Sequence, residues 1–487
     1  MAKGLNPIGL ASFMKWYEEN QDRFWQGILL LAVLLNIYAL TTSDLGLDTH
    51  QKMAYVEVEG GYALDWGDVR LENPNASNPD DASIVSNPPL TAGYSSEAVL
   101  FSLIAISIIG YIVGMRKEFI ALILIHPALI FATGRGYDEP IIALLMAFVI
   151  LLMTLSENSK NSWVIKMLIG LPILGILVIK NTIPEDSLLI PTLILILAMG
   201  VSCCIPDSFF QPKKMLLEGF GLGIVLVLIL GFIGKGTPTI IFDEPGRFLY
   251  ALPFAIIDVI LIYGFIGMVI WPFFKQTWEN MTSSKDRLVG ELALIIGGFT
   301  GLITMYVAVL WAYESILWNS DWPWHMFIMG NNGRYITLLA VPIYFLIMRV
   351  NDEIDWKNVK VFIGVMLILP LSIAASIHGQ TMWTDDAAES MEIEPDEHFL
   401  FVSDATLGMH WLYTFHEPLN AEEENITGHW RSDEAKWQDD LNDELSHVNW
   451  IVLAPEITEV PSGWMLHESG DADFLNGDGE WRVLKRV

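Results

Sequence analysis

The stretch FATGRGYDEPIIALL, residues 131–145, sets three charged side chains between two apolar runs. The charged residues are Arg135, Asp138 and Glu139. An apolar helix of about 20 residues crosses the hydrocarbon core of a bilayer, and an ionisable group at the end of such a helix costs free energy unless it has a partner or faces water. The stretch therefore predicts two membrane helices joined by a turn that is a candidate functional site.

The whole chain is unusually apolar. Of its 487 residues, 53% are hydrophobic and 17% are charged, which excludes an ordinary soluble enzyme and predicts an α-helical polytopic membrane protein. Apolar runs long enough, or nearly long enough, to cross a bilayer recur about eleven times. They lie at about 24–41, 97–114, 119–133, 140–155, 163–180, 187–205, 216–233, 252–274, 288–312, 335–349 and 360–378. We therefore expect about eleven transmembrane helices in the cell membrane.

The lysines and arginines predict the orientation, because cytoplasmic loops retain positive charge. If the N-terminus is cytoplasmic, the inner side holds fifteen of the 27 basic residues, the outer loops hold seven, and the segment after the last span holds five. An odd number of spans then places the C-terminal segment outside. The acidic residues before the first apolar run, with no small-residue cleavage site after it, indicate a retained span and not a signal peptide.

Two parts of the chain extend beyond the predicted membrane. Within a transmembrane domain of residues 1–379, the first outer loop at 42–96 is far longer than a connecting turn, and loops of this length are usually functional or disordered. Residues 380–487 hold 25 Asp and Glu against 5 Lys and Arg. This predicts an acidic, extracytoplasmic, soluble domain suited to a salt-rich exterior such as that of an archaeon, with no nucleic-acid partner. Its short apolar runs, and a helical pattern at 433–445, predict a small α/β fold.

The two carboxylates of the opening stretch have two interpretations. In the first, Asp138 and Glu139 are the N-cap and first-turn acids of the following helix, where the helix dipole favours negative charge and Pro140 fits the first turn. In the second they are functional, since Arg135 supplies a countercharge and the glycines on either side of it permit a tight backbone. The sequence leaves both open.

A second acidic site follows the first predicted span, in TTSDLGLDTHQKMAYVE at 41–57. Asp44 and Asp48 stand a few residues beyond the apolar run, with His50 next to them. Acidic residues are disfavoured near the C-terminal end of a helix dipole. Asp48 therefore requires another explanation, and we predict a functional one.

At these residues the chain resembles the GT-C class of membrane glycosyltransferases. FATGRGYDEPIIA is similar to the second acidic motif of the oligosaccharyltransferase catalytic subunit, Tyr-Asp-x-Glu, although Tyr137, Asp138 and Glu139 are consecutive here. NNGRYITLLAVPIYFLI resembles the Arg-Tyr opening of a late span in GT-C enzymes that use a polyprenyl-phosphate sugar. The WWD motif of oligosaccharyltransferases is absent, so the resemblance is closer to protein mannosyltransferases and aminoarabinose transferases.

The resemblance implies transfer of a sugar from a polyprenyl- or dolichyl-phosphate donor, with inversion, to a hydroxyl or amide of a protein, glycan or lipid acceptor. It implies Asp48 as general base and Asp138, supported by Glu139, as the carboxylate that favours an oxocarbenium-like transition state. Arg334 would bind the leaving phosphate, although snorkelling at the interface is an alternative for it. The further candidates for substrate binding are Tyr335, Arg135, Tyr137, His50 and Arg247.

No metal or other cofactor is predicted with certainty. Mg²⁺ or Mn²⁺ could bind the oxygens of Asp48, Asp138 and Glu139, but an arginine alone can neutralise a lipid monophosphate, and we assign no metal ligands. In the C-terminal segment His410, His416 and His429 match no compact ligand spacing. Packing or carbohydrate stacking explains them better.

Two other functions stay open. A flippase or transporter of lipid-linked saccharide, or a membrane-anchored assembly or binding protein, is also compatible with acidic sites on the outer face. The enzyme requires the carboxyls of Asp48 and Asp138 within about 10 Å of each other with Arg334 beside them, because catalysis depends on convergence. A structure decides whether they converge.

Overall fold

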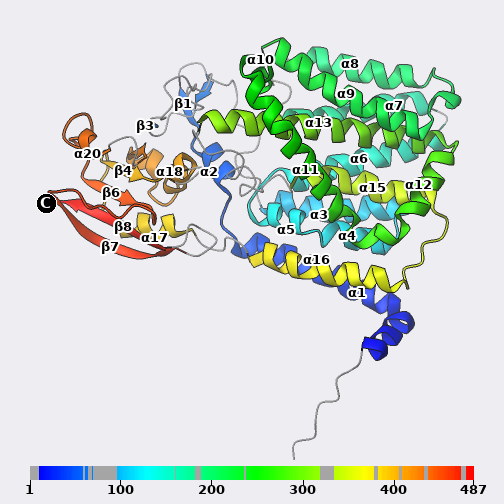
Figure 1. Cartoon of the computed structure of the whole chain (residues 1–487), viewed down its shortest axis with the longest axis horizontal. Helices are drawn as coiled ribbons and strands as arrows, with labels where there is room; N and C mark the ends of the chain where they lie inside the picture. Colours follow the sequence, from blue (N-terminus) through cyan, green and yellow to red (C-terminus); the bar gives the residue numbers. More distant parts are fainter. Residues whose placement is uncertain are drawn as a thin grey trace, which may run out of the picture.

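The computed structural model describes residues 10–58, 61–63, 68–69, 96–159, 161–180, 188–234, 237–317, 334–377, 382–404, 408–432, 437–472 and 479–487. A bundle of long helices forms the larger part of the molecule, and a smaller part built on a β-sheet lies beside it (Figure 1). The helices of the bundle are α1 (Leu10–Thr42), α3 (Ser96–Ile112), α4 (Lys117–Leu124), α5 (Pro127–Gly134), α6 (Glu139–Asn158), α7 (Ser162–Ile179), α8 (Leu189–Ser202), α9 (Pro212–Phe232), α10 (Ile240–Asp243), α11 (Pro245–Ile270), α12 (Phe274–Ser283), α13 (Arg287–Leu317), α15 (Ile336–Val350) and α16 (Val359–Ile377).

Each predicted apolar run is helical, which confirms a polytopic helical membrane protein. Within the described residues, seven helices are long and apolar enough to cross a membrane, or eight if the bent pair α4 and α5 is one span. Three shorter apolar helices, α3, α8 and the described part of α15, fall on the other predicted runs. The number of eleven crossings, and the side on which each terminus lies, stay predictions.

The bent pair shows how a broken helix is tolerated inside the bundle. The axes of α4 and α5 differ by 50°, because Pro127 cannot continue the preceding helix. Asn36 of α1 donates a hydrogen bond to the carbonyl of Leu124 at 2.8 Å, and Ser372 of α16 donates to that of Ile125 at 2.5 Å. Neighbouring spans thus satisfy the backbone groups that the break exposes, as lipid cannot.

Helices α9 and α13 pack unusually closely. Gly219 and Gly223 of α9, and Gly297 and Gly301 of α13, each face the partner's backbone so closely that a Cβ atom would overlap it. Both pairs have the small-xxx-small spacing by which membrane helices approach one another. Because lipid is as apolar as the helices themselves, this close packing replaces the hydrophobic effect as the force that joins them.

The smaller part contains the predicted α/β fold. Its sheet has the order β3-β5-β4-β6-β8-β7, with β5, β4 and β6 parallel and β8 and β7 antiparallel. The strands are β3 (Asp68–Val69), β4 (His398–Val402), β5 (Thr427–Arg431), β6 (Trp450–Leu453), β7 (Trp464–Ala472) and β8 (Gly479–Arg486). The predicted boundary between residues 379 and 380 lies outside the described residues.

The sheet is covered on both faces, as parallel strands require. Along β4, Phe399 and Phe401 face one apolar core, and Leu400 and Val402 face another. The first core is closed by α17 (Trp383–Ser390), α18 (Gly408–Leu412) and the short helix η6 (Tyr413–Phe415), and the second by α20 (Trp437–Asp440) and the turns after it. The helix predicted over 433–445 is therefore too long: α20 ends at Asp440, and Asp and Asn residues continue as turns.

The first outer loop connects the two parts. Its helix α2 (Leu47–Met53) packs against α18 and η6, and Ala54 belongs to the first core of the sheet domain. After the hairpin β1 (Val56–Val58) and β2 (Gly61–Ala63), the loop contributes β3, which pairs with β5 at the edge of the sheet. Figure 1 shows α2 between the bundle and the sheet, so residues on α2 lie at the joint.

Candidate active site

The predicted acids lie where several helices end at this joint. Asp48 is in the first turn of α2, Asp138 is the N-cap residue of α6, and Glu139 is its first residue. Lys180 follows the last residue of α7, and Arg334 lies two residues before the first residue of α15. Segments far apart in the chain therefore deliver charged side chains to one place.

Backbone geometry fixes α2 against the turn between α5 and α6. Gly136 has a φ of +67°, a left-handed conformation that glycine adopts without strain. The carbonyl of Arg135 accepts hydrogen bonds from the amide of Gly46 at 2.9 Å and from Oγ1 of Thr49 at 3.1 Å. A Cβ atom on Gly46 would overlap the ring of Tyr137. The glycine-rich backbone predicted around Arg135 thus allows α2 to dock there.

Arg334 links two of the three carboxylates. Its Nη2 lies 2.8 Å from Oδ2 of Asp48, and its Nε lies 3.7 Å from Oε1 of Glu139. The guanidinium also stacks over the ring of Tyr137, 4.6 Å from the centroid, and lies 5.6 Å from that of Tyr335. Only 13% of the Arg334 side chain is exposed. Its position among carboxylates and aromatic rings differs from that of an arginine that snorkels to the interface.

Two lysines form ion pairs with Asp138 and Glu139. The Nζ of Lys180 lies 2.8 Å from Oε1 of Glu139 and 3.7 Å from Oδ2 of Asp138, and the Nζ of Lys52 lies 3.4 Å from the same Asp138 oxygen. Asp138 makes no side-chain capping hydrogen bond to α6, so the helix-cap interpretation does not explain its orientation. Oδ1 of Asp138 and Oε2 of Glu139 are buried with no hydrogen-bond partner among the described residues. Each of these acids therefore has one carboxylate oxygen that can accept a hydrogen bond from a bound molecule.

The surroundings of Asp48 and Asp138 shift the pKa values of the two carboxyl groups in opposite directions. Burial alone would raise the pKa of Asp48, but the charges of Arg334, His410 and Lys52 outweigh it and lower the pKa to about 2. Asp48 nevertheless keeps 37% of its side chain exposed. Burial raises the pKa of Asp138 above its ordinary value, because Lys180 and Lys52 compensate only partly. Asp48 is the accessible, firmly ionised carboxylate, and Asp138 is the enclosed one.

The remaining predicted residues divide into those at the site and those away from it. His50 is buried on α2, and burial, then the charges of Arg135 and His416, lower its pKa to about 4, so it is neutral at pH 7. Arg135 lies 5.7 Å from the ring centroid of Phe131, and its charge also acts on Asp44. Arg247 lies elsewhere, since its guanidinium donates to Oγ of Ser315 on α13 at 3.3 Å. The structure brings together all the predicted residues except Arg247.

The carboxylates fit a divalent metal poorly. Within the described residues, one group of three side chains has metal-ligand atoms that all lie within 4.8 Å of one another. That group consists of three histidines in the sheet domain and does not include these acids. Arg334, Lys180 and Lys52 already balance the three acids. A further divalent cation would leave excess positive charge in a partly buried pocket, which is costly.

Sequence reasoning did not assign Lys52 and Lys180 to the site. A signal for them exists, because both are basic residues on the predicted outer side, where the positive-inside rule disfavours them. Lys180 in addition directly follows an apolar helix. A cation in such a place needs a partner, and the nearest acids in the predicted topology are those of the opening stretch.

The fold and the site define a polytopic helical membrane protein, with an α/β domain docked over charged residues at the ends of its spans. No protein-family model matches the chain, and no curated protein matches it. Among solved structures, the crystal structure of ArnT from Cupriavidus metallidurans bound to undecaprenyl phosphate is similar, with 11% identity over 94% of this chain and 97% of that chain and a TM-score of 0.40.

Proposed function

We propose that the chain is a membrane glycosyltransferase that moves a sugar from a polyprenyl- or dolichyl-phosphate donor to a hydroxyl or amide acceptor at the outer face of the membrane. The observation that supports this most strongly is the meeting of Asp48, Asp138 and Glu139 with three cations at the joint. Glycosyl transfer develops positive charge on the sugar and negative charge on the leaving phosphate, so it needs fixed groups of both signs in one place. A flippase or an assembly protein has no such need.

In this proposal Asp48 is the general base, and Arg334 controls it. Against the effect of burial, Arg334 holds the pKa of Asp48 at about 2, too low for an efficient base at neutral pH. A donor phosphate competes for the same guanidinium, whose fork suits phosphate oxygens. Asp48 then loses its strongest partner, its pKa rises, and it accepts the proton of the acceptor group as that group attacks the anomeric carbon with inversion. Binding of the donor thus activates the base.

Asp138 and Glu139 stabilise the charge that develops on the sugar. Each has a buried oxygen with no hydrogen-bond partner among the described residues, available to an oxocarbenium-like sugar or to its hydroxyl groups. Lys180 and Lys52 fix the opposite oxygens, so the carboxylates need not reorganise during the reaction. The same lysines supply the charge balance that makes a metal unnecessary.

An apolar cavity offers room for part of the donor's hydrocarbon tail. It has a volume of about 910 Å³ and lies between α9, α11, α12, α13 and α15. Its lining on α15 includes Ile343, Leu346 and Ile347, toward the end of that helix remote from Arg334. A long prenyl chain extending from a phosphate on Arg334 along the bundle would follow this direction.

The test is transfer of radiolabelled sugar from a panel of polyprenyl- and dolichyl-phosphate monosaccharides, comparing the wild type with Asp48→Asn in detergent. We expect the wild type to consume one donor and Asp48→Asn to lose about 10²- to 10⁴-fold in rate, the usual contribution of a general base. The matched control is Asp243→Asn, the same change at an exposed acid of α10, which should transfer normally. Transfer should also persist in EDTA.

Three results would overturn the proposal. The first is no donor consumed by a folded wild type over the whole panel. The second is equal transfer by Asp48→Asn and the wild type, which would remove the base. The third is complete loss in EDTA restored by Mg²⁺ or Mn²⁺, which would replace the arginine and lysines with a metal.

A further inference from the structure

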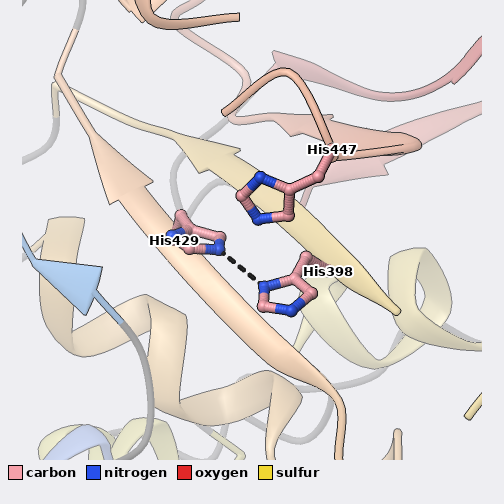
Figure 2. Close-up of side chains that lie close together, drawn as sticks. All are labelled: His398, His429 and His447. Atoms are coloured by element: carbon pink, nitrogen blue, oxygen red, sulfur yellow. Dashed lines mark hydrogen bonds between the residues drawn. The ribbon is translucent and has the colours of Figure 1, made fainter. Parts of the chain in front are cut away.

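Three histidines meet on the sheet domain, away from the carboxylates. They are His398 at the start of β4, His429 on β5 and His447 in the turn before β6. Each offers a ring nitrogen, and these nitrogens all lie within 4.8 Å of one another. Figure 2 shows the three rings turned toward a common point, with Nδ1 of His398 and Nε2 of His429 joined by a hydrogen bond of 3.0 Å.

The register of the sheet explains this meeting. In the parallel pair β4 and β5, His429 lies opposite Leu400, and His398 is two residues before Leu400, on the same face of the sheet. That face carries the second core, which contains Leu445 and Val448 from the turns after α20. His447 lies between Leu445 and Val448 in the sequence, so the segment that packs on this face also places the third imidazole ring beside the other two.

The chemistry of the cluster suits a transition-metal ion. Zn²⁺ binds imidazole at about 2.0–2.1 Å in a tetrahedron, which places ligand nitrogens roughly 3.3 Å apart. His398 and His429 are already near that separation, and His447 is exposed, so its ring can turn the remaining distance. Among the described residues, the cation whose charge acts on His447 is Arg486, which donates hydrogen bonds to the carbonyls of Ser446 and Leu441.

We propose that His398, His429 and His447 bind one divalent transition-metal ion, with Zn²⁺ as the best match and a water molecule in the fourth position. The ion ties the turn that carries His447 to strands β4 and β5. It also fixes β5. The other edge of β5 pairs with β3 of the first outer loop, where a residue of β3 lies opposite His429. Its role is to stabilise the docking of that loop onto the sheet, and it takes no part in the sugar transfer.

The test is zinc content of the full chain, purified in detergent with an affinity tag other than polyhistidine. Protein equilibrated with ZnCl₂ and separated from free metal should retain about one zinc per chain by mass spectrometry of the metal. The decisive variant is His447→Ala, because His447 is exposed and its removal leaves the strands intact. It should retain less than about a fifth of that zinc. The matched control is His467→Ala, a histidine of the same domain that contacts the carbonyl of Ser390, which should bind zinc as the wild type does.

A second measurement distinguishes a defined metal site from nonspecific binding of metal ions at the protein surface. Co²⁺ in a tetrahedral site of three histidines gives intense visible absorption, expected in the wild type and absent in His447→Ala. Zinc should also raise the melting temperature of the wild type and not that of His447→Ala, because an ion that binds the folded state stabilises it. The proposal fails if the wild type holds no stoichiometric zinc, or if His447→Ala holds as much. Neither readout depends on transferase activity.

Discussion

Replacing Arg334 by glutamine tests whether this arginine restrains Asp48. The change removes the charge 2.8 Å from Oδ2 of Asp48 and leaves Lys52 and His410 as the remaining cationic influences on that carboxyl. Burial, which opposes ionisation, is unchanged. The pKa of Asp48 must therefore rise from about 2 toward or above its ordinary value of 3.8.

The size of the effect follows from the same geometry. A full return to 3.8 corresponds to ~2.5 kcal/mol, but 37% of the Asp48 side chain is exposed, and solvent screening reduces the interaction to about 1 kcal/mol. The pKa of Asp48 in Arg334→Gln is then expected between about 3, for the screened interaction, and about 4, for the full return. Because the base must be ionised, kcat/KM at pH 4 should fall by roughly a tenth to a half relative to pH 7. The wild type, with its pKa at about 2, should show no measurable fall.

The assay is the pH dependence of sugar transfer between pH 4 and 8, with the folded state checked at each pH by size-exclusion chromatography. Arg247→Gln is the control, because it makes the same chemical change at an arginine that contacts Ser315. In the wild type, the acid limb of kcat should lie at higher pH than that of kcat/KM, since kcat reports the complex in which phosphate has taken the guanidinium. A limb that does not move in Arg334→Gln, or that moves equally in Arg247→Gln, refutes the restraint.

The remaining predictions concern stability. Lys180→Met should destabilise the folded protein by about 3 kcal/mol, because it leaves Glu139, 1% exposed, without its closest cation, and adding Glu139→Gln should restore the melting temperature. Gly223→Ala should lower the melting temperature by inserting a Cβ against α13, at a cost of about 1–3 kcal/mol, whereas Gly221→Ala meets open space and should be tolerated. Burial, then neighbouring acids, raise the pKa of Asp385 to about 7, so its contribution to stability is lost as the pH rises toward 7. The loss accumulates between pH 3.8 and about 7, so Asp385→Asn should melt higher than the wild type at pH 8, and this advantage should shrink as the pH is lowered toward 4. An advantage that grows as the pH is lowered would contradict the assignment.

The helices were predictable because their cause is local. A run of apolar residues long enough to cross a bilayer must satisfy its own backbone, and a helix does this without partners elsewhere in the chain. The kink at Pro127 is equally local. Asp48, Asp138 and Glu139 could be found for a related reason: each is an acid at the end of an apolar helix, where its cost demands an explanation.

The pairing of charges could not be predicted, because it depends on which helix ends meet. Lys52 and Asp138 are 86 positions apart and Arg334 and Asp48 are 286 apart, and no local pattern records their approach. The histidine cluster has the same origin. His410, His416 and His429 are close in sequence, but the strand register instead joins His429 to His398 and His447. Only the three-dimensional structure could show that grouping.

The position of the site at the joint has a mechanistic consequence. Asp48 is on α2, which is held on one side by the backbone of Arg135 and on the other by α18 and η6 of the sheet domain. Asp138 and Glu139 belong to the bundle alone. The base and the two stabilising carboxylates therefore keep their relative geometry only while the sheet domain stays docked, since a displacement of about 1 Å can cost 10²-fold in rate. In the proposed enzyme the sheet domain thus positions the base as well as bounding the outer face of the site.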